Sequence, residues 1–133
     1  VMGGPVIGRR DRWLVIRDFD TVEGYEQWAS RHRKLADDAP TVRSGRGYHV
    51  YVMTQRRYTW RKLGGNAPGE LIADRRHYAC APPSWHPSGR RYGWVAGSPV
   101  GMSDFPVIKL VESGLVTGCN PVQNTRIKCA QHH

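Results

Sequence analysis

Apolar residues near the start of the chain form one short run that ends in acids. Trp13-Leu14-Val15-Ile16 is followed directly by Arg17-Asp18-Phe19-Asp20. A short, continuous apolar run with polar residues after it is typical of a buried strand. The pattern therefore predicts a strand that carries two carboxylates at its C-terminal end.

The next segment, residues 21–36, has a different period. Its apolar and aromatic positions recur mostly three or four residues apart, which is the signature of an amphipathic helix. These positions are Val22, Tyr25, Trp28, Ala29, Leu35 and Ala36. We predict one helix that ends at Asp37-Asp38-Ala39-Pro40.

Further strands follow the helix. Tyr48-His49-Val50-Tyr51-Val52 is aromatic and β-branched, and the glycine-containing turn Ser44-Gly45-Arg46-Gly47 leads into it. Shorter strands are expected at 70–73, 77–81 and 92–96, a proline-rich turn at 82–89, and one or two helical turns at 107–112. Mostly antiparallel strands with one long helix between the first and second indicate an α+β sandwich.

Length and charge narrow the class of protein. With 133 residues, the expectation is one domain over 1–133, and a net charge of +9 favours a polyanionic partner such as nucleic acid. Three cysteines are an odd number at irregular spacing, which argues against a secreted disulfide framework and fits the cytoplasm. No apolar run approaches the roughly 20 residues of a bilayer span, so no membrane is expected as a partner.

Asp18 and Asp20 are the sharpest candidates for chemistry. Two residues apart on a strand, their side chains share one face, where carboxylate oxygens suit Mg²⁺ or Mn²⁺. Phosphoryl transfer to a nucleotide uses such ions in two-metal sites. The alternative is a capping box over Asp20-Thr21-Val22-Glu23, in which Asp20 only caps the following helix.

Other polar residues are candidates for supporting roles. His49 lies behind the glycine-rich turn, where it is either structural or a donor to a nucleotide phosphate, with the turn amides and Arg46 completing an anion site. Glu70 is a candidate third carboxylate, and Asp74 is its rival.

The basic aromatic stretch 56–62 either tracks a phosphate backbone or is an ordinary charged hairpin. Its cations are Arg56, Arg57, Arg61 and Lys62. A zinc site is disfavoured, because Cys119, Cys129, His132 and His133 show no CxxC or HxxxH spacing.

The order and spacing of these motifs resemble the bifunctional primase-polymerase (Prim-Pol) domain of the archaeo-eukaryotic primase superfamily, found in replication proteins of plasmids, phages and other mobile genetic elements. That family shows Asp-x-Asp after an apolar strand, Ser-Gly-x-x-x-His, a third acid, and Tyr-x-x-x-Pro-Pro-Ser-x-His-Pro-Ser-Gly. They stand here as Asp18-Phe19-Asp20, Ser44 to His49, Glu70, and Tyr78 to Gly89. The resemblance covers about residues 13–94, and its last motif is the most specific.

The resemblance implies a fold and a reaction. The fold is an archaeo-eukaryotic primase-like core with an RRM-like, mostly antiparallel sheet and packed helices. The reaction is DNA priming or template-dependent polymerisation, in which a 3′-hydroxyl attacks a nucleoside triphosphate and pyrophosphate leaves. Partners would be a DNA template and primer, nucleoside triphosphates, and a helicase domain or subunit.

The resemblance also assigns residues. Asp18, Asp20 and Glu70 would bind catalytic Mg²⁺ or Mn²⁺, and His49, with Ser44 and Arg46 nearby, would contact the nucleotide phosphates. Ser84 and His86 would brace the site.

This sequence departs from the family pattern at three points. Gly47 stands where the family often has serine, Glu70 lies one residue further from Tyr78 than expected, and only seventeen residues precede Asp18. We therefore expect a fragment or a minimal core of a longer protein. Two other functions stay open: a metal-dependent nuclease built on the same acids, and a nonenzymatic nucleic-acid-binding module.

Overall fold

The computed structural model describes residues 3–6, 9–74, 76–77, 79, 93–96 and 105–116, with side chains described for all of these except 9–10 and 93–96. The elements in chain order are β1 (Gly4–Val6), β2 (Arg9–Phe19), α1 (Val22–Arg31), α2 (Arg33–Asp38), β3 (Thr41–Arg43), β4 (Tyr48–Thr54), β5 (Arg61–Leu63), β6 (Gly69–Ile72) and β7 (Gly93–Ala96). The fold class is α+β, as predicted.

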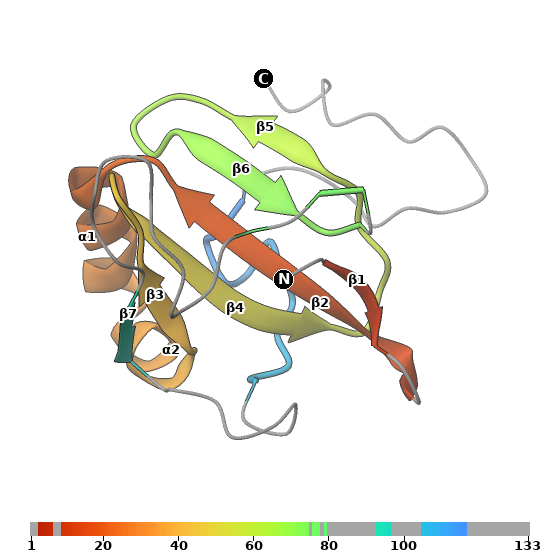
Figure 1. The fold of residues 1–133 in the computed structure, drawn as a ribbon. Coiled ribbons are helices and arrows are strands. Elements are labelled where there is room, and N and C mark those ends of the chain that lie inside the picture. The colour runs from red at the N-terminus through yellow and green to blue at the C-terminus, as the bar shows by residue number, and fades with distance from the viewer. Residues whose placement is uncertain are drawn as a thin grey trace.

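The strands form one sheet with β2 near its centre (Figure 1). Their order is β5-β6-β2-β4-β3-β7, and β1 pairs with β2 beyond the segment that pairs with β6. All strand pairs among the described residues are antiparallel. The central position of β2 explains its continuous apolar run, because Leu14, Val15 and Ile16 are all buried although they point to alternate faces.

Alternation along β2 divides the core into two clusters, one on each face of the sheet. Val15 and Phe19 point to the face that α1 and α2 cover, where they pack with Trp28, Ala29 and Ala36. The other face carries a second cluster, which contains Leu14, Ile16, Tyr51, Met53 and Ile72. Asp18 follows the second set, so it lies on the face away from the helices.

The predicted single helix over 21–36 is two helices. α1 ends at His32, which has φ −130° and ψ 53°, and α2 begins at the next residue. The break coincides with a gap in the apolar spacing, since no apolar residue stands between Ala29 and Leu35. Thr21 caps α1: its side-chain oxygen accepts a hydrogen bond from the Gly24 amide at 3.0 Å.

Most predicted strands are present with shifted ends. The first predicted strand, β2, is longer than its apolar run and spans Arg9–Phe19. The strand predicted at 70–73, which carries Glu70, is β6 and spans Gly69–Ile72. The strand expected at 77–81 is not seen at residues 77 and 79, and its other positions lie outside the described residues. In the segment predicted as helical, Val107 forms a bridge to Met53, and a single turn follows in which the Ser113 amide donates to Lys109 O.

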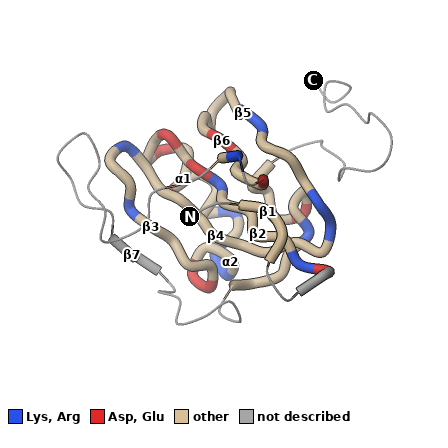
Figure 2. Tube along the Cα trace, turned by 45° about the vertical axis from the view of Figure 1, so that its right-hand side comes forward, with Lys and Arg blue, Asp and Glu red and all other residues tan. Residues whose placement is uncertain are grey.

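Basic positions occur on several elements around the described fold rather than along one strand (Figure 2). The net charge therefore does not by itself mark a binding face. Within the described ranges, no helix has the length and apolar character needed to cross a membrane.

Candidate active site

One row of positions across the sheet gathers the predicted site residues. Asp18 on β2 pairs with His49 on β4 at one edge and with Glu70 on β6 at the other. Lys62 on β5 pairs in turn with Glu70. Residues that pair directly across antiparallel strands point to the same face, so these four side chains form a polar row. The next row on this face, Ile16, Tyr51 and Ile72, is apolar and buried.

Asp18 contacts the histidine of this row. His49 Nε2 lies 3.3 Å from Asp18 Oδ1, and both side chains are largely buried, with 8% and 16% exposed. The glycine-rich turn brings β4 to this position, because Gly47 stands opposite the end of β2 with no room for a side chain. A Cβ atom at Gly47 would lie 2.0 Å from Phe19 O. This close approach requires glycine at position 47.

Glu70 is oriented by a tryptophan. Trp60 Nε1 donates to Glu70 Oε1 at 2.9 Å. Continuing the β5–β6 register puts Trp60 opposite Ile72, which makes it the diagonal neighbour of Glu70 on the same face. The hydrogen bond uses one carboxylate oxygen of Glu70 and leaves Oε2 for a ligand.

Asp74, the rival third acid, belongs to a different set of contacts. Its carboxylate accepts from the backbone amides of Trp60 and Arg76 and lies 2.7 Å from His77 Nδ1. His77 stacks on Trp60, with ring centroids 4.8 Å apart. These hydrogen bonds lower the pKa of Asp74 against the opposing effect of burial. Asp74 thus holds the segment that carries Trp60, whereas Glu70 lies beside Asp18.

Asp20 is not the helix cap, because Thr21 fills that role. The backbone amide of Asp20 donates to Pro68 O at 2.9 Å, and this hydrogen bond connects the end of β2 to the loop before β6. Partial burial raises the pKa of Asp20, and the negative charges of Asp18 and Glu70 raise it further, while Arg46 and Arg17 oppose them. Asp20 therefore shares the electrostatic environment of the row, with Arg46 the nearby cation on the glycine-rich turn.

The family model described as "Bifunctional DNA primase/polymerase, N-terminal" (Prim-Pol) matches residues 4–107. The chain belongs to the Prim-Pol family. No curated protein and no solved structure matched the chain. The match covers β1 to β7 and includes the whole polar row, and it supports a primase- or polymerase-type function in general.

Apart from Ala79, which is buried, the most specific Prim-Pol motif, residues 78–89, lies outside the described residues, and so do Ser84 and His86. The Ser-Gly-x-x-x-His motif is described throughout. Ser44 Oγ accepts from the Gly47 amide at 3.0 Å, and Arg43 Nη1 donates to Gly47 O at 2.7 Å, so both side chains shape the turn. The Ser44 hydroxyl keeps its own proton as a donor.

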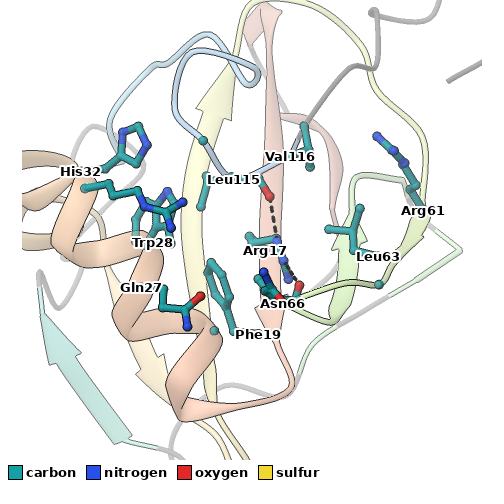
Figure 3. A pocket seen from close by; sticks show the side chains of 15 residues that line it. Arg17, Phe19, Gln27, Trp28, His32, Arg61, Leu63, Asn66, Leu115 and Val116 are labelled. Atoms are coloured by element: carbon teal, nitrogen blue, oxygen red, sulfur yellow. Dashed lines mark hydrogen bonds between the residues drawn. The ribbon is translucent and has the colours of Figure 1, made fainter. Parts of the chain in front are cut away.

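The basic aromatic stretch of this Prim-Pol chain is not one continuous surface. Arg56 and Arg57 are exposed, but Tyr58 is buried in the core beneath the helices. Trp60 is engaged with Glu70, and Arg61 points to a pocket on the helix side of the sheet (Figure 3). Of the four cations predicted to bind nucleic acid, Lys62 is the one that belongs to the polar row.

Sequence reasoning missed two residues that support the site. Trp60 lies in the basic aromatic stretch, where the sequence does not indicate a contact with Glu70. Arg17 separates the apolar run from Asp18, and the sequence motifs assign it no role. The Arg17 side chain is 2% exposed and donates to the backbone oxygens of Leu115, Asp18 and Ala67. It thereby joins β2 to the loop before β6. A cation in the middle of a central strand was the available signal, because such a charge is buried only with hydrogen-bond partners.

The acids fit a hard divalent cation by their chemistry. Three carboxylates supply oxygen donors, and the pKa of Asp20 is raised first by burial and then by the negative charges of Asp18 and Glu70. Among the described residues no three His, Cys, Asp or Glu side chains already stand at metal-binding spacing. Asp18 faces His49 and Glu70 faces Trp60, so a cation held by all three carboxylates would require these side chains to turn from their present contacts.

Proposed function

We propose that this Prim-Pol chain catalyses template-directed transfer of a nucleotide from a nucleoside triphosphate to a 3′-hydroxyl of DNA, with release of pyrophosphate. The observation that carries the proposal is the placement of Asp18 between His49 and Glu70 on adjacent strands. Carboxylates for a cation and an imidazole for a phosphate then face one space on the open side of the sheet. We further propose that the described fold is the archaeo-eukaryotic primase-like core, with an RRM-like sheet, in one domain.

Asp18, Asp20 and Glu70 are the proposed ligands of Mg²⁺ or Mn²⁺. When bound, such ions neutralise the triphosphate and lower the pKa of the attacking hydroxyl. The protein contributes by holding the metal-binding carboxylates in fixed positions. The sheet fixes Asp18 and Glu70 through paired backbones, Trp60 holds one oxygen of Glu70, and the Asp20 amide is fastened to Pro68 O. Catalysis of this kind depends on placing the reactants and on fixed charges.

The glycine-rich turn is the proposed site for the nucleotide phosphates. His49 would donate to a phosphate oxygen, and Arg46, which acts on the Asp20 carboxylate, would add a positive charge beside the acids. The Ser44 hydroxyl is a further donor. DNA would lie across the open face, where Lys62 extends the row of acids, with Arg56 and Arg57 as outer phosphate contacts.

Extension of a labelled primer on a DNA template, with deoxynucleotides and Mn²⁺ or Mg²⁺, tests the proposal. Metal-dependent, template-directed lengthening is the expected result. Shortening of the labelled strand would instead identify a nuclease. DNA binding that ignores the metal, with no change in primer length, would identify a binding module.

Metal binding should also stabilise the fold. We expect Mn²⁺ at a hundred times its Kd to add about 2.7 kcal/mol to the free energy of unfolding, because the cation binds only the folded acids. Thermal unfolding followed by circular dichroism measures this as a higher Tm. Replacing both Asp18 and Asp20 with Asn should remove the shift. The matched control is Asp37→Asn with Asp38→Asn, two exposed acids on α2, which should keep it.

Trp60 should act as a positioning residue for Glu70. Trp60→Phe keeps an aromatic ring for His77 to stack on but removes the N–H that Glu70 accepts. Residues that orient a metal ligand typically affect metal affinity by about tenfold or more, so the Mn²⁺ concentration for half-maximal extension should rise about tenfold. Trp28→Phe is the control, since it removes a buried indole hydrogen bond to Ser113 O on the opposite face. An equal Mn²⁺ dependence in the two variants would contradict the role of Trp60.

A further inference from the structure

A second pocket lies on the helix side of the sheet, away from the row of acids. Its volume is about 400 Å³, and it lies between α1, the β5–β6 connection and the segment around Leu115 (Figure 3). Arg17 and Phe19 line it from β2. Because side chains alternate along a strand, these two residues point to the face opposite Asp18. The pocket is therefore separated from the proposed catalytic row by the sheet itself.

The charged side chains in the described lining of this pocket are all basic. Three arginines and a histidine line it, and its described lining contains no Asp or Glu; these four residues are Arg17, Arg31, Arg61 and His32. Arg31 is exposed at the end of α1, and Arg61 is half-buried on β5. Concave sites that collect one sign of charge concentrate ligands of the opposite sign. The pocket is thus suited to an anion.

Arg17 makes the pocket more than a patch of surface cations. It is 2% exposed, and its guanidinium donates to three backbone oxygens rather than to a carboxylate. A guanidinium has five N–H groups, so donors remain after these three bonds. A guanidinium stays charged at neutral pH even when it is buried. A fixed cation therefore stands at the inner end of the pocket.

The remaining lining suits the organic part of a ligand. The aromatic rings of Phe19 and Trp28, which are 1% and 5% exposed, lie 5.6 Å apart and form an aromatic wall of the pocket, which Leu63 also lines. Gln27 and Asn66 supply exposed side-chain amides that can pair with polar edges of a base. Ligand pockets typically combine an apolar lining with a few polar groups in volumes of about 300–1,000 Å³.

We propose that this pocket binds a nucleoside phosphate without a metal ion, at a site separate from the row of acids. The phosphate would face the arginines and the nucleoside would lie along the aromatic wall. This inference does not depend on the proposed polymerase function, since it uses no residue of the acid row.

Isothermal titration with AMP in EDTA and 150 mM salt tests the proposal. AMP should bind, and both adenosine and inorganic phosphate should bind at least tenfold more weakly, because each lacks half of the contacts. Arg31→Ala with Arg61→Ala should weaken AMP binding at least tenfold. The matched control, Arg33→Ala with Lys34→Ala, removes the same charge from exposed positions of α2 outside this lining and should change binding less than twofold.

A third variant separates the pocket from the catalytic row. Asp18→Ala with Asp20→Ala should leave AMP binding in EDTA unchanged. The proposal is overturned by any of three results: no AMP binding, equal weakening in the two arginine and lysine variants, or loss of binding in the aspartate variant. Circular dichroism establishes that each variant is folded, and Arg31→Ala alone, at an exposed position, gives a reading if the double variant unfolds.

Discussion

Asp18→Asn should abolish primer extension, lowering its rate by roughly a thousandfold or more, while the protein stays folded and still binds DNA. Asparagine has the same shape as aspartate but is a neutral and much weaker metal ligand. If the acids hold the catalytic cations, removing the central carboxylate removes both a ligand and the charge that balances the metal, and metal-ion catalysis supplies several kcal/mol of barrier lowering. Single-turnover extension with saturating deoxynucleotides measures the loss.

The position of Asp18 makes this substitution informative. It is the member of the row with a site residue on each side, His49 and Glu70. Glu23→Gln is the control, because Glu23 is an exposed acid in the first turn of α1 and its loss changes the net charge equally. Extension by Asp18→Asn at more than a tenth of the wild-type rate would refute a catalytic role for this carboxylate.

The candidate site could be outlined from the sequence because its residues lie in short local motifs. An apolar run followed by acids two apart predicts a strand that carries Asp18, and Asp20 lies just beyond the end of that strand in the structure. The glycine-rich turn before His49 predicts where the next strand begins. What the sequence could not provide is the register between strands, which depends on turn geometry and on which face is buried. Register is what puts Glu70, rather than Asp74, beside Asp18.

Other features were unpredictable because they depend on tertiary contacts. The short strands β1 and β3 have too few residues for a visible alternation, and they are ordered by pairing with β2 and β4. The bond from Trp60 to Glu70 crosses between two strands, and Arg17 is bound by oxygens up to 98 residues away in the chain. The local sequence pattern does not indicate a hydrogen-bond partner for Trp60 or for Arg17.

Arg17 and Asp18 show how one strand serves two faces. Arg17 directs a cation toward the helix side and also holds the backbone oxygen of Asp18 and that of Ala67 in the loop leading to β6. Asp18 directs an anion toward the open side. The same backbone thus fixes the acid row and the inner wall of the second pocket, so the geometry of each site depends on the loop that connects β5 to β6.

Gly69→Ala tests that dependence, and we expect it to destabilise the fold by roughly 3–5 kcal/mol, a large effect for one methyl group. Gly69 has φ +151°, a conformation that residues with a Cβ atom rarely adopt. A Cβ here would lie 1.9 Å from Asp18 O and 2.8 Å from Arg17 Nη1. The backbone of β6 would have to move away from β2 at the point where Asp18 and Glu70 pair. Urea unfolding measures the change in stability.

Gly64→Ala is the matched control, in the β5–β6 connection that leads to Gly69. A Cβ at Gly64 meets no atom within 4 Å, so this variant should be neutral or slightly stabilising, because alanine restricts the unfolded chain. Extension activity should follow the same division, with Gly69→Ala losing it even at temperatures where the protein remains folded. Equal stability of the two variants would mean that β6 does not approach β2 as closely as the pairing of Phe19 with Gly69 requires.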